Sequence, residues 1–478
     1  MGVTKKHLSV VSAAICIAAV AASAAVASAS HRARTYATRW TPPMQTGMFD
    51  PFTFNTPQYA KAFAMTKRVG ADYAQIIVRW SQVEPGAPPA GSEEDPTSYA
   101  FSWDAIDTKV EAVEAAGLTP MLEIGSAPGW AIATGSTPKI DLLQEFAKAL
   151  ALHFDGESGG PAVHIFEVWN EPNLSLDLSP VSAATYRSMV NAVADSVHAV
   201  SKANLVVAGQ LDPFKNKARN WHSVAPLAYM RALLCVSSGK HPHRTCEAQI
   251  HFDVWSHHPY THGDPFTHAR LKDDVSLGDL PKMHALLKTA RRLHRIVSAH
   301  PPQFWVTEIS WDTNPPRKHA APLQLEARWT AEALYQMWRS GVTLAVWYVL
   351  QDQKSPSVYQ SGLYFYSSSL AHARAKPMRT AFRFPFVAYL GRGTVSVWGR
   401  DATSDKRLVT IERRIGARGR WRTVARIRSN RYGIFRATLP LAATKRYWLR
   451  AVASHSGRSL AFSLTRPSPK LHYGPWGS

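Results

Sequence analysis

The chain has 478 residues, of which 45% are hydrophobic and 19% are charged, and its formal net charge is +21. This length exceeds one typical domain, the apolar fraction suffices for a large buried core, and no segment after residue 30 is apolar enough to span a bilayer. The charge is uneven, because residues 387–478 hold 19 Lys and Arg against 3 Asp and Glu. The composition therefore predicts a large, nearly balanced domain followed by a small basic one.

The N-terminus is typical of a secretory signal peptide over residues 1–29. Lys5 and Lys6 precede a largely apolar stretch, Leu8–Val20, and small residues follow as far as the A-x-A site Ala27–Ala29. An uncleaved membrane anchor is the alternative, but the apolar stretch is shorter than a spanning helix requires. We expect a secreted, extracellular protein, with association with the cell wall left open.

Eight short apolar runs alternate with amphipathic stretches between residues 46 and 385. The expected strands are 47–52, 73–80, 119–124, 164–169, 205–209, 252–257, 304–309 and 344–349. Segments with apolar residues three and four apart, expected as helices, are 103–116, 140–154, 184–202, 281–297, 324–340 and 376–384. Eight such units predict an α/β fold, a (β/α)8 TIM barrel over residues 30–386. A doubly wound sheet fits the same periodicity, but the regular repeat favours closure.

Two cysteines remain after the signal peptide, Cys235 and Cys246. In an oxidising compartment two cysteines so close in sequence predict one local disulfide. A pair of reduced thiols is the alternative. A zinc site that also uses His241 or His243 fits no usual ligand spacing.

The C-terminal segment, residues 387–478, changes to short β-rich runs separated by turn residues. The runs are 394–398, 408–413, 421–428, 434–439, 447–452 and 460–464, which predict a small antiparallel sandwich. Its charge suits an anionic cell-wall or extracellular polymer, whereas no nucleic-acid-binding motif is present. The alternating arginines of the segment 420–428 fit solvated strand faces, which favours a structural role over polymer binding.

Two glutamates stand where apolar strands of the expected barrel end. Glu171 ends the string HIFEVWNE, and Glu308 lies in FWVTEISW. Glycosidic cleavage needs two such carboxyls, one to protonate the leaving oxygen and one to stabilise or capture the anomeric centre. Two rim glutamates in ordinary salt bridges are the alternative. The chemistry requires neither a metal nor another cofactor.

The strings FEVWNEPN, at Glu171, and VTEISW, at Glu308, resemble clan A glycoside hydrolases. The first string resembles family 39 closely, with family 5 a near second, and the resemblance follows the barrel in order over about three quarters of the chain. The context TEISW resembles family 5 more than the usual β-xylosidase pattern. The resemblance therefore implies a retaining mechanism, with carboxyls about 5 Å apart, and no particular sugar.

Carried over by position, the resemblance assigns roles to five residues. Glu171 resembles the acid/base and Glu308 the nucleophile. Asn170 resembles the amide that holds the sugar 2-hydroxyl. Arg79 and Tyr260 resemble the pair that hydrogen-bonds the nucleophile and keeps it ionised.

One histidine and three tryptophans are further candidates for contact with substrate. His258 is expected in the same pocket, with a neutral structural histidine as the alternative. Trp347, Trp80 and Trp130 offer aromatic faces on which sugar rings stack, and core packing is the alternative for each.

Four other carboxyls are expected outside the chemistry. Glu167 shares strand parity with Glu171 but lies deeper, where a charged or hydrogen-bonded packing partner is expected. Glu123 precedes the rim. Glu84 stands in a loop in which a solvated role is the default. Asp352 follows the last strand and could edge a subsite, although nothing in the sequence places it there.

The sequence favours hydrolysis of a β-linked oligo- or polysaccharide. A transglycosylase that uses the same site, and a glycan-binding protein on a catalytically decayed barrel, are the rival functions. Both glutamates are present, which argues against decay.

Overall fold

The computed structural model describes residues 33–38, 41–157, 160–355, 359–402, 407–416, 418–467 and 473–475. The expected signal peptide, residues 1–29, lies outside them. Among the helices in the described ranges, none combines the length and the hydropathy of a membrane span.

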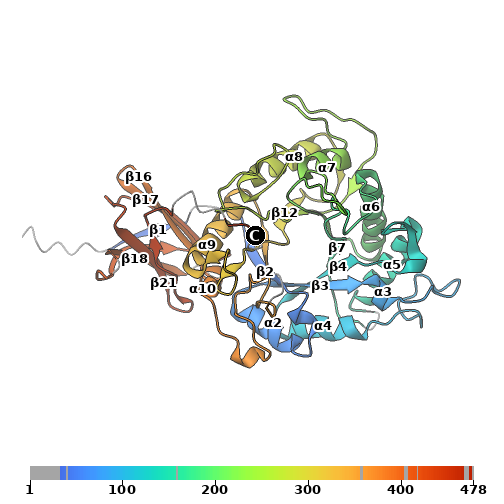
Figure 1. Cartoon of the computed structure of the whole chain (residues 1–478), viewed down its shortest axis with the longest axis horizontal. Helices are drawn as coiled ribbons and strands as arrows, with labels where there is room; N and C mark the ends of the chain where they lie inside the picture. Colours follow the sequence, from blue (N-terminus) through green and yellow to red (C-terminus); the bar gives the residue numbers. More distant parts are fainter. Residues whose placement is uncertain are drawn as a thin grey trace, which may run out of the picture.

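The core of the molecule is a closed parallel barrel (Figure 1). In chain order its strands are β2 (Gln45–Phe49), β3 (Tyr73–Arg79), β4 (Thr119–Gly125), β7 (Ile165–Val168), β8 (Leu205–Leu211), β10 (Val254–His257), β12 (Gln303–Val306) and β15 (Leu344–Tyr348). The barrel closes where β15 pairs with β2 in parallel, from Leu344 opposite Gln45 to Tyr348 opposite Phe49. The predicted (β/α)8 architecture is confirmed.

Helices surround the barrel on its outer side (Figure 1). They are α2 (Tyr59–Arg68), α3 (Trp80–Val83), α4 (Asp104–Ala115), α5 (Ile140–His153), α6 (Ala183–Val200), α7 (Pro226–Leu234), α8 (Leu280–Arg292), α9 (Leu323–Arg339) and α10 (Pro377–Arg383). In α5 the buried residues Leu143, Phe146, Ala147 and Leu150 recur at three and four. This spacing forms one apolar face, and the face packs inward because its burial drives folding.

Each barrel strand is buried on both sides. Side chains that point into the barrel form one cluster, which includes Phe49, Met121, Trp305 and Tyr348. Side chains that point outward join a larger cluster between the strands and the helices. Successive residues of a strand face opposite sides. A shift of one position along the strand therefore decides whether a side chain lies inside the barrel or between the strands and the helices.

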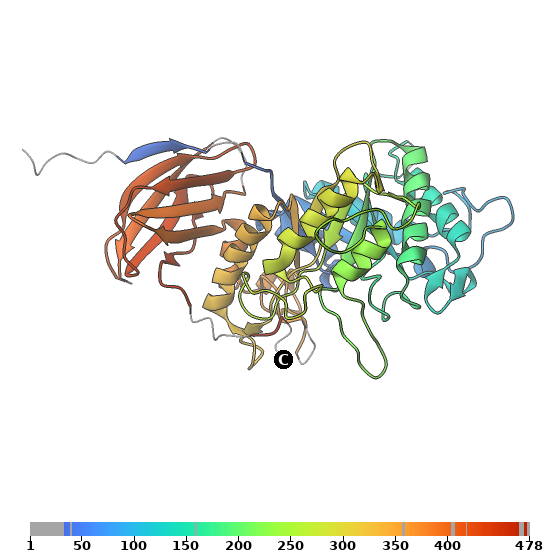
Figure 2. The ribbon, with the colours of Figure 1, turned by 90° about the horizontal axis from the view of Figure 1, so that it is seen from above.

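The C-terminal residues form two further sheets (Figure 2). One consists of β16 (Phe386–Gly391), β17 (Thr394–Arg400) and β20 (Ile434–Leu439). The other contains β18 (Leu408–Ile415), β19 (Arg422–Arg428), β21 (Tyr447–Ala453), β22 (Gly457–Arg458) and β23 (Phe462–Ser463). All of the strands expected here from sequence have counterparts in these sheets.

The second sheet also receives a strand from the start of the chain. β1 (Arg34–Ala37) pairs in parallel with β19, Arg34 opposite Ala425 and Ala37 opposite Arg428. In Figures 1 and 2 this blue strand lies against the red sheet. The sequence assigned residues 34–37 to the barrel domain, whereas the structure places them in the C-terminal sheet.

The barrel and the C-terminal sheets share a buried contact. Arg400, which is 2% exposed, donates a hydrogen bond of 2.7 Å to Asp72 and one of 3.1 Å to Thr46 of the barrel. Trp398 packs against Trp338 of α9, with ring centroids 5.6 Å apart. These contacts hold the two parts together through both charge and apolar area.

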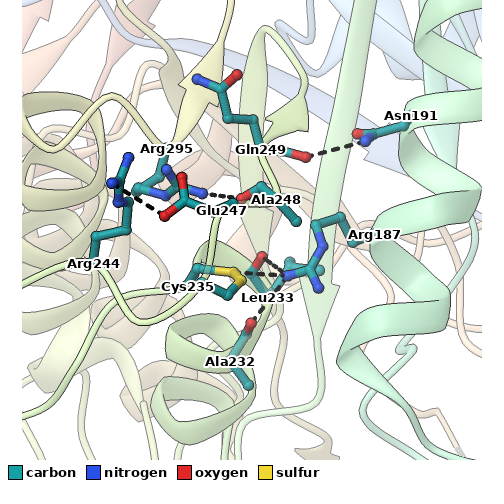
Figure 3. The surroundings of a disulfide bond; sticks show 11 residues. Arg187, Asn191, Ala232, Leu233, Cys235, Arg244, Glu247, Ala248, Gln249 and Arg295 are labelled. Carbon is teal, nitrogen blue, oxygen red and sulfur yellow. Dashed lines mark hydrogen bonds and ion pairs between the residues drawn. A yellow bond between two sulfur atoms is a disulfide. The ribbon is translucent and has the colours of Figure 1, made fainter.

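A disulfide joins Cys235 and Cys246, with Cα atoms 5.3 Å apart (Figure 3). Cys235 ends α7 in a left-handed conformation, at φ 52°. Arg187 of α6 donates to the carbonyls of Ala232 and Leu233 at the same helix end. The predicted disulfide is therefore present, and it anchors the following loop to α7.

Candidate active site

The two glutamates singled out in the sequence lie on one rim of the barrel. Glu171 follows the end of β7 at Val168, and Glu308 follows the end of β12 at Val306. Because all eight strands are parallel, their carboxyl ends meet on one face, where barrel enzymes place their catalytic groups.

The turn that carries Glu171 has an unusual backbone. Trp169 and Glu171 have φ values of 65° and 34°, which side chains other than glycine rarely adopt and which concentrate at functional sites. The indole of Trp169 donates to the carbonyl of Asp177 at 3.0 Å. Asn173, fully buried, donates to the carbonyls of Asp212 and Val224. These bonds hold the turn against the loop that follows β8.

His258 links the two carboxyls. Its Nδ1 lies 3.0 Å from Oε1 of Glu171 and 3.9 Å from Oε2 of Glu308. The two carboxyl oxygens are thus separated by no more than the sum of these distances, a limit that admits both the separation of roughly 5–5.5 Å in retaining glycosidases and the lower end of the range of roughly 6.5–9.5 Å in inverting ones. Tyr260 donates a hydrogen bond of 2.7 Å to Oε2 of Glu308. Glu171 is thus hydrogen-bonded to His258 and Glu308 to Tyr260, and the approach of His258 to Glu308 brings the two pairs into one group.

Burial dominates the electrostatics of this group. It raises the pKa of Glu308 to about 7, where the adjacent Glu171 adds to the increase while His258 and the hydrogen bond from Tyr260 oppose it. Burial, together with the charges of Asp177 and Glu123, raises the pKa of Glu171 well above its usual range. Burial also lowers the pKa of His258. The site therefore retains a proton near neutral pH, and only Glu308 has a hydroxyl donor that favours its ionised form.

A pocket of about 400 Å³ opens beside Glu308. Its polar lining comprises Arg79, Glu123, Ser126, Ser136, Asn170, Asp177 and Glu308. Its apolar lining includes Phe49, Ile77, Trp169, Leu176 and Tyr348. A cavity with both polar and apolar lining suits a small polar ligand with apolar faces.

Two candidate residues line this pocket, namely Asn170, which was expected to hold a sugar hydroxyl, and Arg79, which was expected to hydrogen-bond the nucleophile. Asn170 donates to Asp177 at 2.9 Å, and its own Oδ1 is buried without a partner among the described residues. Arg79 is half-buried and has no ion pair in the part of the chain that the structure describes. Both carry hydrogen-bonding capacity that a ligand would satisfy. Asp177, which received no role from the sequence, accepts the bond from Asn170 and lines the same pocket.

The three expected tryptophans lie elsewhere. Trp80 is fully buried, stacks on Phe146 of α5 at 4.8 Å and donates to Glu84 at 2.6 Å. Trp347, 1% exposed, points outward and donates to the carbonyl of Ser361. Trp130 is half-buried and stands edge-on to Trp80. None of them lines the pocket, so the geometry favours core packing for all three.

The aromatic residues at the pocket are different ones. Tyr348, the neighbour of Trp347, points inward and lines the pocket. Tyr359 stands edge-on to it at 5.1 Å and stacks on Phe52 at 5.8 Å. Burial, followed by the charges of Glu308 and Glu171, raises the pKa of Tyr359 to about 12. In the sequence Tyr359 lies in a long loop and carries no signal.

The remaining carboxyls divide between the pocket and the core. Glu123 lines the pocket and accepts a hydrogen bond of 2.6 Å from Gln75. Glu167 is fully buried, and neither of its oxygens has a hydrogen-bond partner in the described ranges, in contrast to the expected packing partner. Glu84 is buried rather than solvated, because it accepts from Trp80. Asp352 forms a buried ion pair of 2.6 Å with Lys376, away from the pocket.

The described side chains include no group of three or more His, Cys, Asp or Glu that is arranged to hold a metal ion.

Neither a protein-family model nor a curated protein sequence matches the chain. Solved structures do. The GH39 enzyme from Xanthomonas axonopodis pv. citri matches with a TM-score of 0.51 and 14% identity, over 86% of this chain and 95% of its own. The chain has the fold of this glycoside hydrolase.

Two further structures match over a similar extent. A monomeric β-xylosidase from Caulobacter crescentus CB15 has a TM-score of 0.50 and 16% identity, over 80% of this chain and 86% of its own. A glucosidase from Croceicoccus marinus has a TM-score of 0.50 and 12% identity, over 89% of this chain and 98% of its own. The resemblance read from the sequence is thus confirmed at the level of the fold.

Proposed function

We propose that this protein is a secreted, retaining glycoside hydrolase that cleaves O-glycosidic bonds in a β-linked oligo- or polysaccharide. The observation that carries the proposal is the contact of one imidazole, that of His258, with both Glu171 and Glu308 at the rim of the barrel. The likeness of the fold to enzymes named as a xylosidase and a glucosidase supports the same reading.

In the first step Glu308 is the nucleophile. Its carboxylate attacks the anomeric carbon while protonated Glu171 donates its proton to the glycosidic oxygen, so that the bond to the leaving group breaks and an alcohol departs. The hydrogen bond from Tyr260 stabilises the ionised form of Glu308 before the attack. The raised pKa of Glu171 keeps its proton available at neutral pH.

In the second step the roles of acid and base reverse. Ionised Glu171 accepts a proton from a water molecule, the water oxygen attacks the anomeric carbon, and the bond to Glu308 breaks to restore its carboxylate. Two inversions leave the product with the configuration of the substrate. Arg79 and the free Oδ1 of Asn170 are proposed to bind sugar hydroxyls, and Tyr348 to provide the apolar face.

Turnover on a panel of aryl β-glycosides and β-linked polysaccharides, followed by NMR of the first-formed anomer, tests the proposal. We expect a β product from the wild type and no turnover from Glu308→Gln. Glu84→Gln is the matched control, because Glu84 is another buried glutamate with a raised pKa but lies outside the pocket. An α product, or full activity of Glu308→Gln, would refute the assignment.

The same panel separates the rival functions. A transglycosylase would form longer products when a saccharide acceptor competes with water. A decayed, glycan-binding barrel would retain a saccharide without turnover in any variant. Either result would replace hydrolysis as the function of this site.

Export is part of the proposal. The signal-like N-terminus and the disulfide between Cys235 and Cys246 both suit an oxidising compartment. N-terminal sequencing of protein recovered from the medium should begin at Ser30, directly after the A-x-A site. Recovery of the intact N-terminus in the membrane fraction would contradict this.

For the basic C-terminal sheets we propose a structural role. Arg414 lies over Trp421 and Trp448, and Arg450 lies over Trp421 at 4.1 Å. Arginines stacked on aromatic rings cover the sheet while their charges stay near water. Docking on an anionic cell-wall polymer is the competing proposal, and retention of the protein on polyanion beads at physiological salt, undiminished by competing soluble saccharide, would favour it.

A further inference from the structure

A second pocket, of about 930 Å³, lies on the loop that follows β8. Its walls come from residues 215–225 and 271–273, with Ala228 of α7. The charged side chains in this lining are Lys215, Lys217, Arg219, Lys272 and Asp273. The half-buried indole of Trp221 gives it an apolar surface. We call it the basic pocket.

The basic pocket is built on an ordered hairpin. Lys217 pairs with His222 as an antiparallel bridge, and the amide of Ala218 donates to the carbonyl of Trp221 at 2.8 Å. The hydroxyl of Ser223 donates to the carbonyl of Phe214 at 2.6 Å and closes the base of the hairpin. The cationic side chains are thus carried by a backbone that already holds its conformation, which lowers the entropic cost of binding.

The positive charge of the basic pocket is not neutralised from within. Lys217, Arg219 and Lys272 form no ion pair with a carboxylate in the described ranges, and all three are exposed. The one carboxylate in the lining, Asp273, is paired with Arg231 at 2.7 Å. An approaching anion would therefore meet uncompensated positive charge beside an aromatic ring.

The basic pocket adjoins the side of the active site at Glu171. The amide of Ser175 donates to the carbonyl of His222, and the amide of His222 donates to the hydroxyl of Ser175. The two residues that follow Ser175, Leu176 and Asp177, line the catalytic pocket. One short segment, residues 173–177, thus forms a wall of the catalytic pocket and supports the hairpin of the basic pocket.

Under the proposed mechanism Glu171 protonates the leaving oxygen, so the leaving group lies on its side of the scissile bond. We infer that the basic pocket receives the leaving-group portion of an anionic saccharide, one whose sugars carry carboxylate or sulfate-ester groups. This inference rests on the proposed function, since it takes its direction from the role of Glu171. It narrows the substrate class from any β-linked glycan to acidic ones.

The test measures binding by calorimetry, which does not depend on turnover. The probes share a β-1,4-glucan backbone and differ in charge: cellohexaose, the corresponding β-1,4-linked glucuronate hexamer, and sulfated cellohexaose. We expect the wild type to prefer an anionic probe, and the preference to shrink as salt screens the charges. The uronate and sulfate arms show which anion is recognised.

The variant Lys217→Ser/Arg219→Ser/Lys272→Ser should weaken binding of the preferred anionic probe roughly tenfold at low salt. The matched control, Arg418→Ser/Arg420→Ser/Arg422→Ser, removes the same number of exposed cations from the C-terminal segment and should leave that affinity unchanged. All six side chains are exposed, so both variants should fold.

Three outcomes would overturn the inference: equal binding of neutral and anionic probes, an unaffected pocket variant, or an equal loss in the control. Hydrolysis of the anionic probes, as well as of neutral aryl β-glycosides, is measured in parallel. Its absence, with anion binding intact and dependent on the pocket, would refute the proposed hydrolase rather than the anion site.

Discussion

The hydroxyl of Tyr260 donates a hydrogen bond of 2.7 Å to Oε2 of Glu308. The bond opposes the effect of burial, which raises the pKa of this carboxyl to about 7. A carboxyl that must attack in its ionised form therefore depends on a neighbouring phenol, and the first prediction follows from this dependence.

The variant Tyr260→Phe should raise the pKa of Glu308 further, because it removes a donor that favours the charged form. Activity requires ionised Glu308 and is lost as the pH falls through its pKa, so the acidic limb of the kcat/KM profile should move to higher pH. At neutral pH the loss should be about 10- to 100-fold. Tyr229→Phe, which removes a buried phenol bonded to Ser182 away from the pocket, should leave the limb in place.

The variant Glu308→Gly should be inactive in water and regain turnover with added azide. The small anion enters the space left by the side chain and attacks the anomeric carbon directly, so a β-glycoside should give an α-glycosyl azide. NMR of the azide adduct reads the configuration. A β-configured azide would show that Glu308 is not the nucleophile.

The variant Glu171→Ala should discriminate between leaving groups. General acid catalysis contributes about 10²- to 10⁴-fold, and only substrates with basic leaving groups need it in the first step. We expect that order of loss in kcat/KM for an alkyl β-glycoside and a much smaller loss for a dinitrophenyl β-glycoside. Equal losses for both substrates would remove Glu171 from the role of acid.

The variant Glu167→Gln should change how stability depends on pH. Burial, followed by the charges of Glu123 and Glu308, raises the pKa of Glu167 well above its usual range in the folded protein. The unfolded chain therefore loses this proton first, and wild-type stability should fall by about 1.4 kcal/mol per pH unit between the unfolded and folded pKa values. The gain in Tm on substitution should be small at pH 5 and grow towards pH 8. Glu111→Gln, at an exposed helix position, should show no such trend.

Loss of the disulfide should destabilise the fold without touching the chemistry. The bond closes a segment with a sequence separation of 11, for which chain entropy predicts about 2–3 kcal/mol. Cys235→Ala/Cys246→Ala should lower Tm and leave kcat unchanged on small aryl glycosides. A thiol titration of the wild type, positive only after reduction, checks that the bond forms.

The barrel could be predicted from sequence because its strands are buried on both sides and its helices on one. A strand buried on both sides is a continuous apolar run, and a helix buried on one side has apolar residues three and four apart. The continuity of the runs also explains an unmet expectation. In the string LAVWYV nothing distinguishes the inward from the outward positions, so Trp347 was expected at the pocket where Tyr348 stands.

Other parts of the site depend on contacts that no local pattern encodes. Trp80 follows β3 directly, but it is also the first residue of α3. Its indole therefore packs against Phe146 of α5 and not in the pocket. Tyr359 lies outside the strands and helices and stacks on Phe52, which is far from it in sequence. Asp177 gains its place from the hydrogen bond that it accepts from Asn170. By contrast Glu171 and Glu308 stand where strands end, so strand order alone brings them to one rim.

The pairing of β1 with β19 makes the barrel, in topological terms, an insertion between two neighbouring strands of the C-terminal sheet. During synthesis this pair can form only after the whole barrel has emerged, so completion of the sheet is a late event in folding. Excision of the barrel together with β1 would remove one of the two neighbours of β19 and leave the other, β18, so a truncated barrel should begin after β1 rather than before it. A pulling force applied to the two ends of the chain would load the pairing of β1 with β19 at one end. At the other end it would load the hydrogen bonds that Gly263 and Asp312 of the barrel donate to the carbonyls of Tyr473 and Pro475.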